Sequence, residues 1–123
     1  MKTINIAYAR LASDNPMAVL DQLSAVCKFM EADGVDISTS KLLVEKSYKY
    51  SRPRYSQLIE LIQSIPADTD IILYVYSLDR LSRNQDTIKY FLSIKNLIIR
   101  VVTEPSVIYK NNSIYILNNR VGN

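Results

Sequence analysis

Arginines are the residues of this 123-residue chain that most clearly suggest a chemical role. They follow apolar runs or precede a helix-like segment: Arg10, Arg52, Arg54, Arg80 and Arg83. The planar guanidinium of arginine matches the geometry of phosphate oxygens. Several guanidiniums at one place can also stabilise the charge that develops on phosphorus during phosphoryl transfer. The residue types therefore favour a phosphate-handling site.

An alternative explanation is structural. Clustered cations repel one another, so they need either an anionic ligand or acidic partners. Three acidic residues are candidate partners: Asp79, Glu45 and Glu104. On this alternative, each arginine is a solvated surface residue or half of an ion pair with one of those carboxylates.

Strand-like and helix-like segments alternate along the chain, which predicts a three-layer α/β fold with a mainly parallel sheet. We expect strands at residues 4–9, 41–45, 70–77 and 97–103, in the order 2-1-3-4, with helices on both sides. The run 70–77 is almost continuously apolar, as in a strand covered on both faces. The polar segment 78–84 is expected to be a loop.

Three helices are expected between these strands. Pro16 suits the first helical position, with Asn15 as the N-cap and Gly34 as the C-terminal cap. Spacings of three and four then predict one apolar face: Met17, Leu20, Leu23, Cys27 and Met30. The second helix lies between Pro53 and Pro66, and the third covers residues 85–95.

The tail, residues 106–123, differs from the rest of the chain. Two β-prone runs within 107–117 flank Asn111 and Asn112, and asparagine tolerates the positive φ of a two-residue hairpin turn. We therefore expect a C-terminal hairpin or an antiparallel edge strand.

In a parallel sheet with right-handed crossovers, all the carboxyl ends of the strands meet at one edge, where open α/β folds bind ligands. The first strand leads to Arg10 and the second to Glu45, Lys46 and Ser47. The third leads to Asp79, Arg80 and Arg83, and the fourth to Glu104. Arg52 and Arg54 open the second helix beside these strand ends. The sequence therefore predicts that four or five guanidiniums share this edge.

Composition narrows the class of protein. With 48% hydrophobic and 22% charged residues, the chain is expected to form a single domain over residues 1–123. No apolar run approaches the ~20 residues of a spanning helix, and no secretory signal is recognised, so a cytoplasmic protein without membrane contact is expected. One cysteine, Cys27, and no histidine argue against a disulfide, a zinc site or a histidine base, so no metal and no cofactor is expected. The net charge of +3 is too small to identify a partner.

Three segments in the same order resemble the catalytic domain of the serine site-specific recombinases, the resolvase/invertase family. They are "YARLAS" at 8–13, "EKSYKYSRPRY" at 45–55 and "YSLDRLSRN" at 76–84. The resemblance covers roughly residues 3 to 105. It implies a serine that attacks a DNA phosphate to give a 5′-phosphoserine link, without a metal.

The resemblance also implies roles for individual residues. The phosphate would be held by four arginines: Arg10, Arg52, Arg80 and Arg83. Asp79 would orient these arginines or handle a proton, and Gln22 and Ser47 match further polar positions of the site. Arg54, beside Arg52, is a further candidate for DNA contact. The implied partner is DNA, through its backbone phosphates.

The opening motif departs from the family pattern. The family motif is Tyr-x-Arg-x-Ser, and counting from Tyr8 and Arg10 places the nucleophile at Ala12. A methyl group cannot attack phosphorus, and loss of the serine nucleophile in another enzyme class lowers turnover on the order of 10⁶-fold. Three explanations are open: an engineered serine-to-alanine change, a naturally inactive relative, or a local shift that lets Ser13 act.

A second departure is at the C-terminal end. The family usually continues into a long dimerisation helix and a DNA-binding domain, and neither is expected within this chain, either because it is a fragment or because the protein has lost both parts. The function is therefore expected to be that of a serine recombinase catalytic domain impaired at its nucleophile. The alternative is a non-catalytic relative that binds DNA backbone or regulates a recombinase.

The candidate protein partners are a second copy of the chain or another recombinase. A nucleotide-binding module is poorly supported, because Gly34 and Gly122 form no phosphate-cradling loop.

Overall fold

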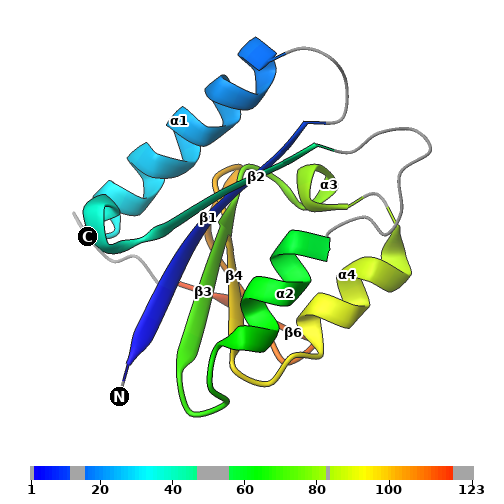
Figure 1. Ribbon diagram of the computed structural model, residues 1–123. Helices are drawn as coiled ribbons and strands as arrows, with labels where there is room; N and C mark the ends of the chain where they lie inside the picture. Colours follow the sequence, from blue (N-terminus) through cyan, green and yellow to red (C-terminus); the bar gives the residue numbers. More distant parts are fainter. Residues whose placement is uncertain (1, 12–15, 47–55, 83, 118–123) are drawn as a thin grey trace.

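The computed structural model describes residues 2–11, 16–46, 56–82 and 84–117. Among these residues, six strands form one sheet in the order β2-β1-β3-β4-β5-β6 (Figure 1). The strands are β1 (Thr3–Leu11), β2 (Lys41–Lys46), β3 (Asp70–Val75), β4 (Leu97–Val101), β5 (Glu104–Lys110) and β6 (Ser113–Ile116). The helices are α1 (Pro16–Ala32), the 3₁₀ turn η1 (Ile37–Thr39), α2 (Ser56–Ser64), α3 (Leu78–Leu81) and α4 (Gln85–Leu92).

The first four strands are parallel, and the predicted order 2-1-3-4 is confirmed. Helix α1 covers one face of the sheet, while α2 and α4 cover the other (Figure 1). This is the predicted three-layer α/β fold. In the register of β1 and β2, Arg10 lies directly opposite Glu45, so the ends of these two strands are aligned.

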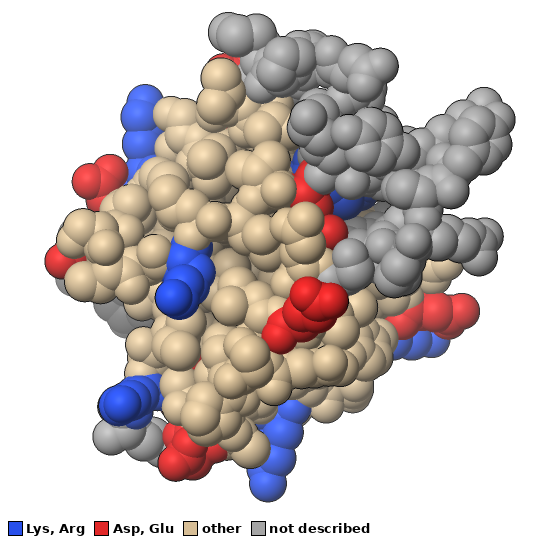
Figure 2. Space-filling view, viewed as in Figure 1, with Lys and Arg blue, Asp and Glu red and all other residues tan. Residues whose placement is uncertain are grey.

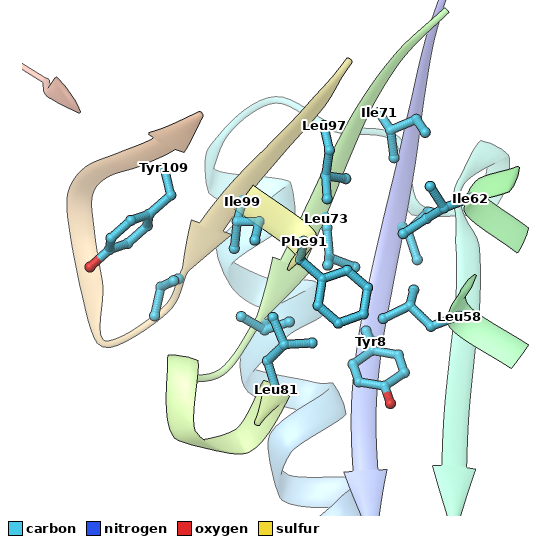
Figure 3. Close-up of a cluster of buried hydrophobic side chains, with 13 residues drawn as sticks. Tyr8, Leu58, Ile62, Ile71, Leu73, Leu81, Phe91, Leu97, Ile99 and Tyr109 are labelled. Carbon is cyan, nitrogen blue, oxygen red and sulfur yellow. The ribbon is translucent and has the colours of Figure 1, made fainter. Parts of the chain in front are cut away.

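The larger core lies between the sheet and the helices α2 and α4 (Figure 3). Tyr8, Leu73 and Ile99 contribute to it from three neighbouring strands, and Leu58 and Phe91 contribute from the two helices. A smaller core lies under α1 and contains Ala7, Val26, Met30 and Tyr74. The burial of β3 residues by both cores confirms that β3 is a central strand covered on both faces.

The apolar face of α1 is rotated from the predicted one. Among residues 19–32 of α1, for which burial is described, the buried ones are Val19, Gln22, Val26 and Met30, whereas Leu20 is 57% exposed. The spacing of Val19, Val26 and Met30 follows one stripe of a 3.6-residue helix, and Leu20 lies about 100° away from Val19. Gly34 follows the helix with a φ of 84°, which confirms the predicted glycine cap.

The C-terminal part of the sheet is an antiparallel hairpin. Strand β5 pairs antiparallel with β4, and β6 pairs antiparallel with β5. Asn111 and Asn112 have φ values of 51° and 60°, as a two-residue type I′ turn requires. The predicted hairpin and the predicted antiparallel addition to the sheet are therefore both present.

Several predicted boundaries are wrong: β3 ends at Val75 rather than at residue 77, and α4 ends at Leu92 rather than at residue 95. The segment 78–84 is not entirely a loop, because α3 forms one helical turn after β3. The fourth strand ends at Val101 rather than at residue 103, since the chain turns there and Glu104 already belongs to β5. None of the helices in the described residues is long and apolar enough to cross a membrane.

Candidate functional site

Arg10 joins two of the segments that carry candidate residues. Its side chain lies at the carboxyl end of β1 and is only 9% exposed. The Arg10 Nε donates a hydrogen bond to the backbone carbonyl of Arg80, at 3.2 Å. The end of β1 is thereby fixed to α3, so two candidate arginines that are seventy positions apart in sequence belong to the same site.

Gln22 supports the same strand end from α1. Its side chain is 6% exposed, and its Nε2 donates to the Arg10 carbonyl oxygen at 3.4 Å. A buried amide at the centre of an otherwise apolar helix face is costly unless it is hydrogen-bonded. The structure therefore brings Gln22 against the backbone of Arg10.

Glu45 contributes a buried carboxylate beside Arg10. Its Oε1 accepts a hydrogen bond from the Leu58 amide at 2.7 Å, near the start of α2. Burial raises the pKa of the Glu45 carboxyl above its ordinary value. Hydrogen bonds from the backbone of Leu58 and Gln57 and from the Tyr8 hydroxyl, and the charge of Arg10, offset part of that rise. Figure 3 shows the Tyr8 hydroxyl directed toward the carboxyl end of β1.

Helix α3 presents polar side chains from a short, well-anchored turn. The Ser77 Oγ caps the helix by accepting from the Arg80 amide at 3.3 Å. Leu81 is fully buried in the larger core (Figure 3), and burying a leucine of this kind stabilises the fold by about 2 kcal/mol. Asp79 is exposed and Arg80 is half-buried. The "DRL" turn therefore anchors one side chain in the core and leaves its two charged residues at the surface.

The comparisons with known proteins bear on this geometry. The family model "Resolvase, N terminal domain" matches residues 5–114. The chain belongs to that family. It is also similar in structure to the "N-terminal Catalytic Domain of TP901-1 Integrase", with a TM-score of 0.58 and 24% sequence identity, over 85% of this chain and 79% of the other. No curated protein sequence matches this chain significantly.

In this resolvase domain the fold confirms that the strand ends meet, while the chemical roles stay predictions. Arg10, Gln22 and Arg80 are brought together by hydrogen bonds. Asp79 is on the same short helix as Arg80 but is exposed. The remaining candidates lie outside the described residues: Ala12, Ser13, Ser47, Arg52, Arg54 and Arg83.

Two acidic residues make contacts that the ion-pair alternative did not include. Glu104 accepts a hydrogen bond from the Tyr109 hydroxyl at 2.9 Å, on β5. Glu45 acts as a buried acceptor for α2 as well as a neighbour of Arg10. The sequence indicates that Glu45 faces the core. Residues 43 and 45 lie on the same face of β2, and Leu43 packs against the larger core.

Charge on the described part of the face in Figure 2 is dispersed. On the face shown in Figure 2, Lys and Arg side chains are scattered and alternate with Asp and Glu, apart from what the grey atoms cover. No group of three or more His, Cys, Asp or Glu side chains within the described residues could hold a metal ion. The described atoms on the face in view therefore form no broad basic surface.

Proposed function

We propose that this resolvase domain holds a DNA backbone phosphate at the carboxyl ends of β1 and β3 and is impaired in strand cleavage. The observation that carries the proposal is the hydrogen bond from Arg10 to the Arg80 carbonyl, which joins both arginine-bearing segments at one strand edge. Arginine at such an edge suits the bidentate recognition of phosphate oxygens.

The site is built to keep Arg10 in one position. Its backbone is contacted by Gln22, its side chain is tied to α3, and the Glu45 carboxylate lies beside it. A guanidinium held in this way loses little conformational freedom when a phosphate binds, so its contribution to affinity is larger than that of a mobile surface side chain. Affinity of this kind requires no nucleophile.

Cleavage would need a hydroxyl at the position of Ala12. A serine there would attack phosphorus, form a phosphoserine bond and release the 3′-hydroxyl of the broken strand. Alanine has no atom that can form this bond. Ser13 follows at once, but a displacement of even ~1 Å from the attack geometry can lower the rate about 100-fold.

Nicking of negatively supercoiled plasmid DNA tests the impaired-cleavage proposal. The unaltered chain and Ser13→Ala should give no nicks, whereas Ala12→Ser should give nicks and a covalent protein–DNA adduct that survives denaturation with detergent. Nicking by the unaltered chain that disappears in Ser13→Ala would show that Ser13 is the nucleophile, which overturns the proposal. Failure of Ala12→Ser to cleave would instead favour the non-catalytic relative that binds DNA or regulates a recombinase.

Salt-dependent binding to random duplex DNA tests the phosphate contact. The logarithm of affinity should fall linearly with the logarithm of salt concentration, by about 0.9 for each phosphate contacted. Arg80→Ala should reduce this slope by about 1. The matched control is Lys41→Ala, which removes one exposed charge at the amino end of β2. A slope near zero for the unaltered chain, or equal effects of both substitutions, contradicts the proposed site.

A further inference from the structure

The two edges of the sheet differ in character. The β2 edge carries charged residues in its sequence, Lys41, Glu45 and Lys46. The opposite edge, β6, carries none, and the side chains along it and just after it are strongly exposed: Ile114 (64%), Tyr115 (54%), Ile116 (76%) and Leu117 (40%). Edge strands in monomeric proteins are usually protected by charges, proline or a bulge, because an unprotected edge can pair with another strand. Strand β6 has no such protection in its sequence.

The register identifies which backbone groups of β6 face outward. The Asn111–Asn112 turn is closed by Lys110 and Ser113, and Tyr115 lies opposite Ile108. The Leu117 amide donates to the Ser106 carbonyl at 2.6 Å. Since hydrogen-bonded and non-hydrogen-bonded pairs alternate in an antiparallel ladder, residues 113, 115 and 117 bond to β5. The N–H and C=O groups of Ile114 and Ile116 therefore point away from β5.

This edge is complementary to itself. The sequence Ile114-Tyr115-Ile116 reads the same in both directions. When two such strands lie antiparallel about a two-fold axis at Tyr115, Ile114 of one copy is opposite the partner's Ile116, and each pair exchanges two backbone hydrogen bonds. The isoleucines then lie side by side on one face of the joined sheet, and the two Tyr115 rings face each other on the other.

We propose that β6 pairs with the β6 strand of a second copy of this chain, so that two six-stranded sheets join into one continuous sheet. These exposed side chains alternate between the two faces of the sheet, so edge pairing would cover mainly the outward backbone groups and part of the Ile114 and Ile116 side chains. The buried area would lie at the low end for a specific interface, below ~1,200 Å². The dimer is therefore expected to be weak, with a dissociation constant in about the micromolar range.

The proposed dimer is independent of the proposed function. In the sheet order, β4 and β5 lie between β6 and β3, and β2 and β1 lie beyond β3, so pairing through β6 leaves the strand ends of β1 and β3 uncovered. The family match ends at residue 114, so the second half of β6, Tyr115 and Ile116, is outside the matched region. The test requires no DNA, and its result does not depend on whether the arginine site binds phosphate.

Sedimentation equilibrium of the full chain, over protein concentrations on either side of the micromolar range, tests the proposal. The unaltered chain should change from monomer to dimer, and Ile116→Lys should remain monomeric. The matched control is Leu42→Lys, which places the same charge at a 52% exposed apolar position on the other edge strand and should dimerise normally. Circular dichroism establishes that each variant is folded. A monomer at every concentration, or a dimer lost only in Leu42→Lys, overturns the proposal.

Amide hydrogen exchange provides a second readout that identifies the edge. At dimer-forming concentrations the amides of Ile114 and Ile116 should exchange at least several-fold more slowly than at low concentration. The Tyr115 amide, which already bonds to β5, should change much less. Protection of Ile114 and Ile116 that is the same at all concentrations would mean that another segment of the same chain covers the edge, which also overturns the proposal.

Discussion

Asp33 and Arg100 form a partly buried ion pair at the C-terminal end of α1, in which Arg100 is the buried member and Asp33 is the more exposed one. Arg100 Nη1 lies 2.7 Å from Asp33 Oδ2, and Nη2 donates to the Pro105 carbonyl at 2.9 Å. The guanidinium also lies over the Phe29 ring, 5.0 Å from its centroid. The Tyr74 hydroxyl donates to the same Asp33 oxygen at 3.3 Å. These contacts link α1 to β3, β4 and the start of β5 through two charged side chains.

Removing one member of this pair should destabilise the protein more than removing both. Asp33→Ala leaves the Arg100 guanidinium buried without its counter-ion and should lower the free energy of unfolding by about 3 kcal/mol. The double variant Asp33→Ala/Arg100→Met should lose less, because no unpaired charge is left under α1. Urea unfolding of the single and double variants measures both values. Additive losses would show that the two side chains are not energetically coupled.

Glu45 should make stability depend on pH. Its carboxyl has a folded pKa above the ordinary value of 4.5, because it is buried. Its stabilising contribution is therefore fully present below the unfolded pKa and is lost as pH rises through the raised folded pKa. Glu45→Gln keeps an oxygen acceptor for the Leu58 amide but cannot ionise.

The comparison of unaltered chain and Glu45→Gln isolates this titration. As pH is raised from 4 to 7, the free energy of unfolding of the unaltered chain should fall relative to that of Glu45→Gln. Urea unfolding at several pH values measures the difference. Glu60→Gln, an exposed carboxylate on α2, is the control and should show no such trend. A difference that grows in the opposite direction would mean that the charge of Arg10, rather than burial, dominates the pKa of Glu45.

At the scale of elements, the β5–β6 turn depends on residues that accept positive φ. Asn112→Val places a β-branched residue at a φ of 60° and should cost about 1–2 kcal/mol of stability. Asn112→Gly creates the Asn-Gly pair preferred in this turn and should be neutral or stabilising. Ser113→Val is the control, since a β-branched residue suits the first position of β6. Thermal unfolding of the three variants checks this order of stabilities. Equal losses of stability in Asn112→Val and Ser113→Val would contradict the turn assignment.

An element could be predicted from the sequence where neighbouring residues specify it, and could not where contacts with distant segments do. Strands β1 to β4 and the three longer helices were predicted from apolar runs and periodicity, which are local. Helix α3 has only four residues, Leu78–Leu81, too few for a 3.6-residue period to register. The exposure of Leu20 was also missed, because several apolar residues on α1 allow more than one face and only packing against β1 and β3 selects between them.

In the candidate site, too, the features that follow from strand order could be predicted, and the contacts between distant side chains could not. The meeting of Arg10 with the Arg80 segment followed from parallel strand order, a rule of topology. Alternation along β2 places Glu45 on the same face as Leu43, but its hydrogen bond to the Leu58 amide also depends on the depth at which α2 packs, which spacing does not give. The Asp33–Arg100 pair spans sixty-seven positions and has no local signature. Contacts between side chains of distant segments are the part of the site that only three-dimensional packing determines.

For the whole molecule, the sheet order predicts a gradient of local stability. Strand β3 has neighbours on both sides and a core on both faces, and Leu73 and Ile71 are fully buried. Strand β6 has one neighbour, and its residues are exposed. Amides that open only when the core is lost exchange with the free energy of global unfolding, whereas amides at a frayed edge exchange through local opening.

Native-state hydrogen exchange at low protein concentration should therefore separate the two ends of the sheet. The amides of 71–75 should exchange with the free energy of global unfolding, measured independently in urea. The hydrogen-bonded Tyr115 amide should exchange with an opening free energy several-fold smaller than that of global unfolding. Opening the hairpin exposes little buried apolar surface. The Asn112→Val substitution should lower protection at Tyr115 further and shift the β3 amides only by its effect on global stability. Equal protection at both ends would show that the hairpin unfolds together with the central strands, as one cooperative unit.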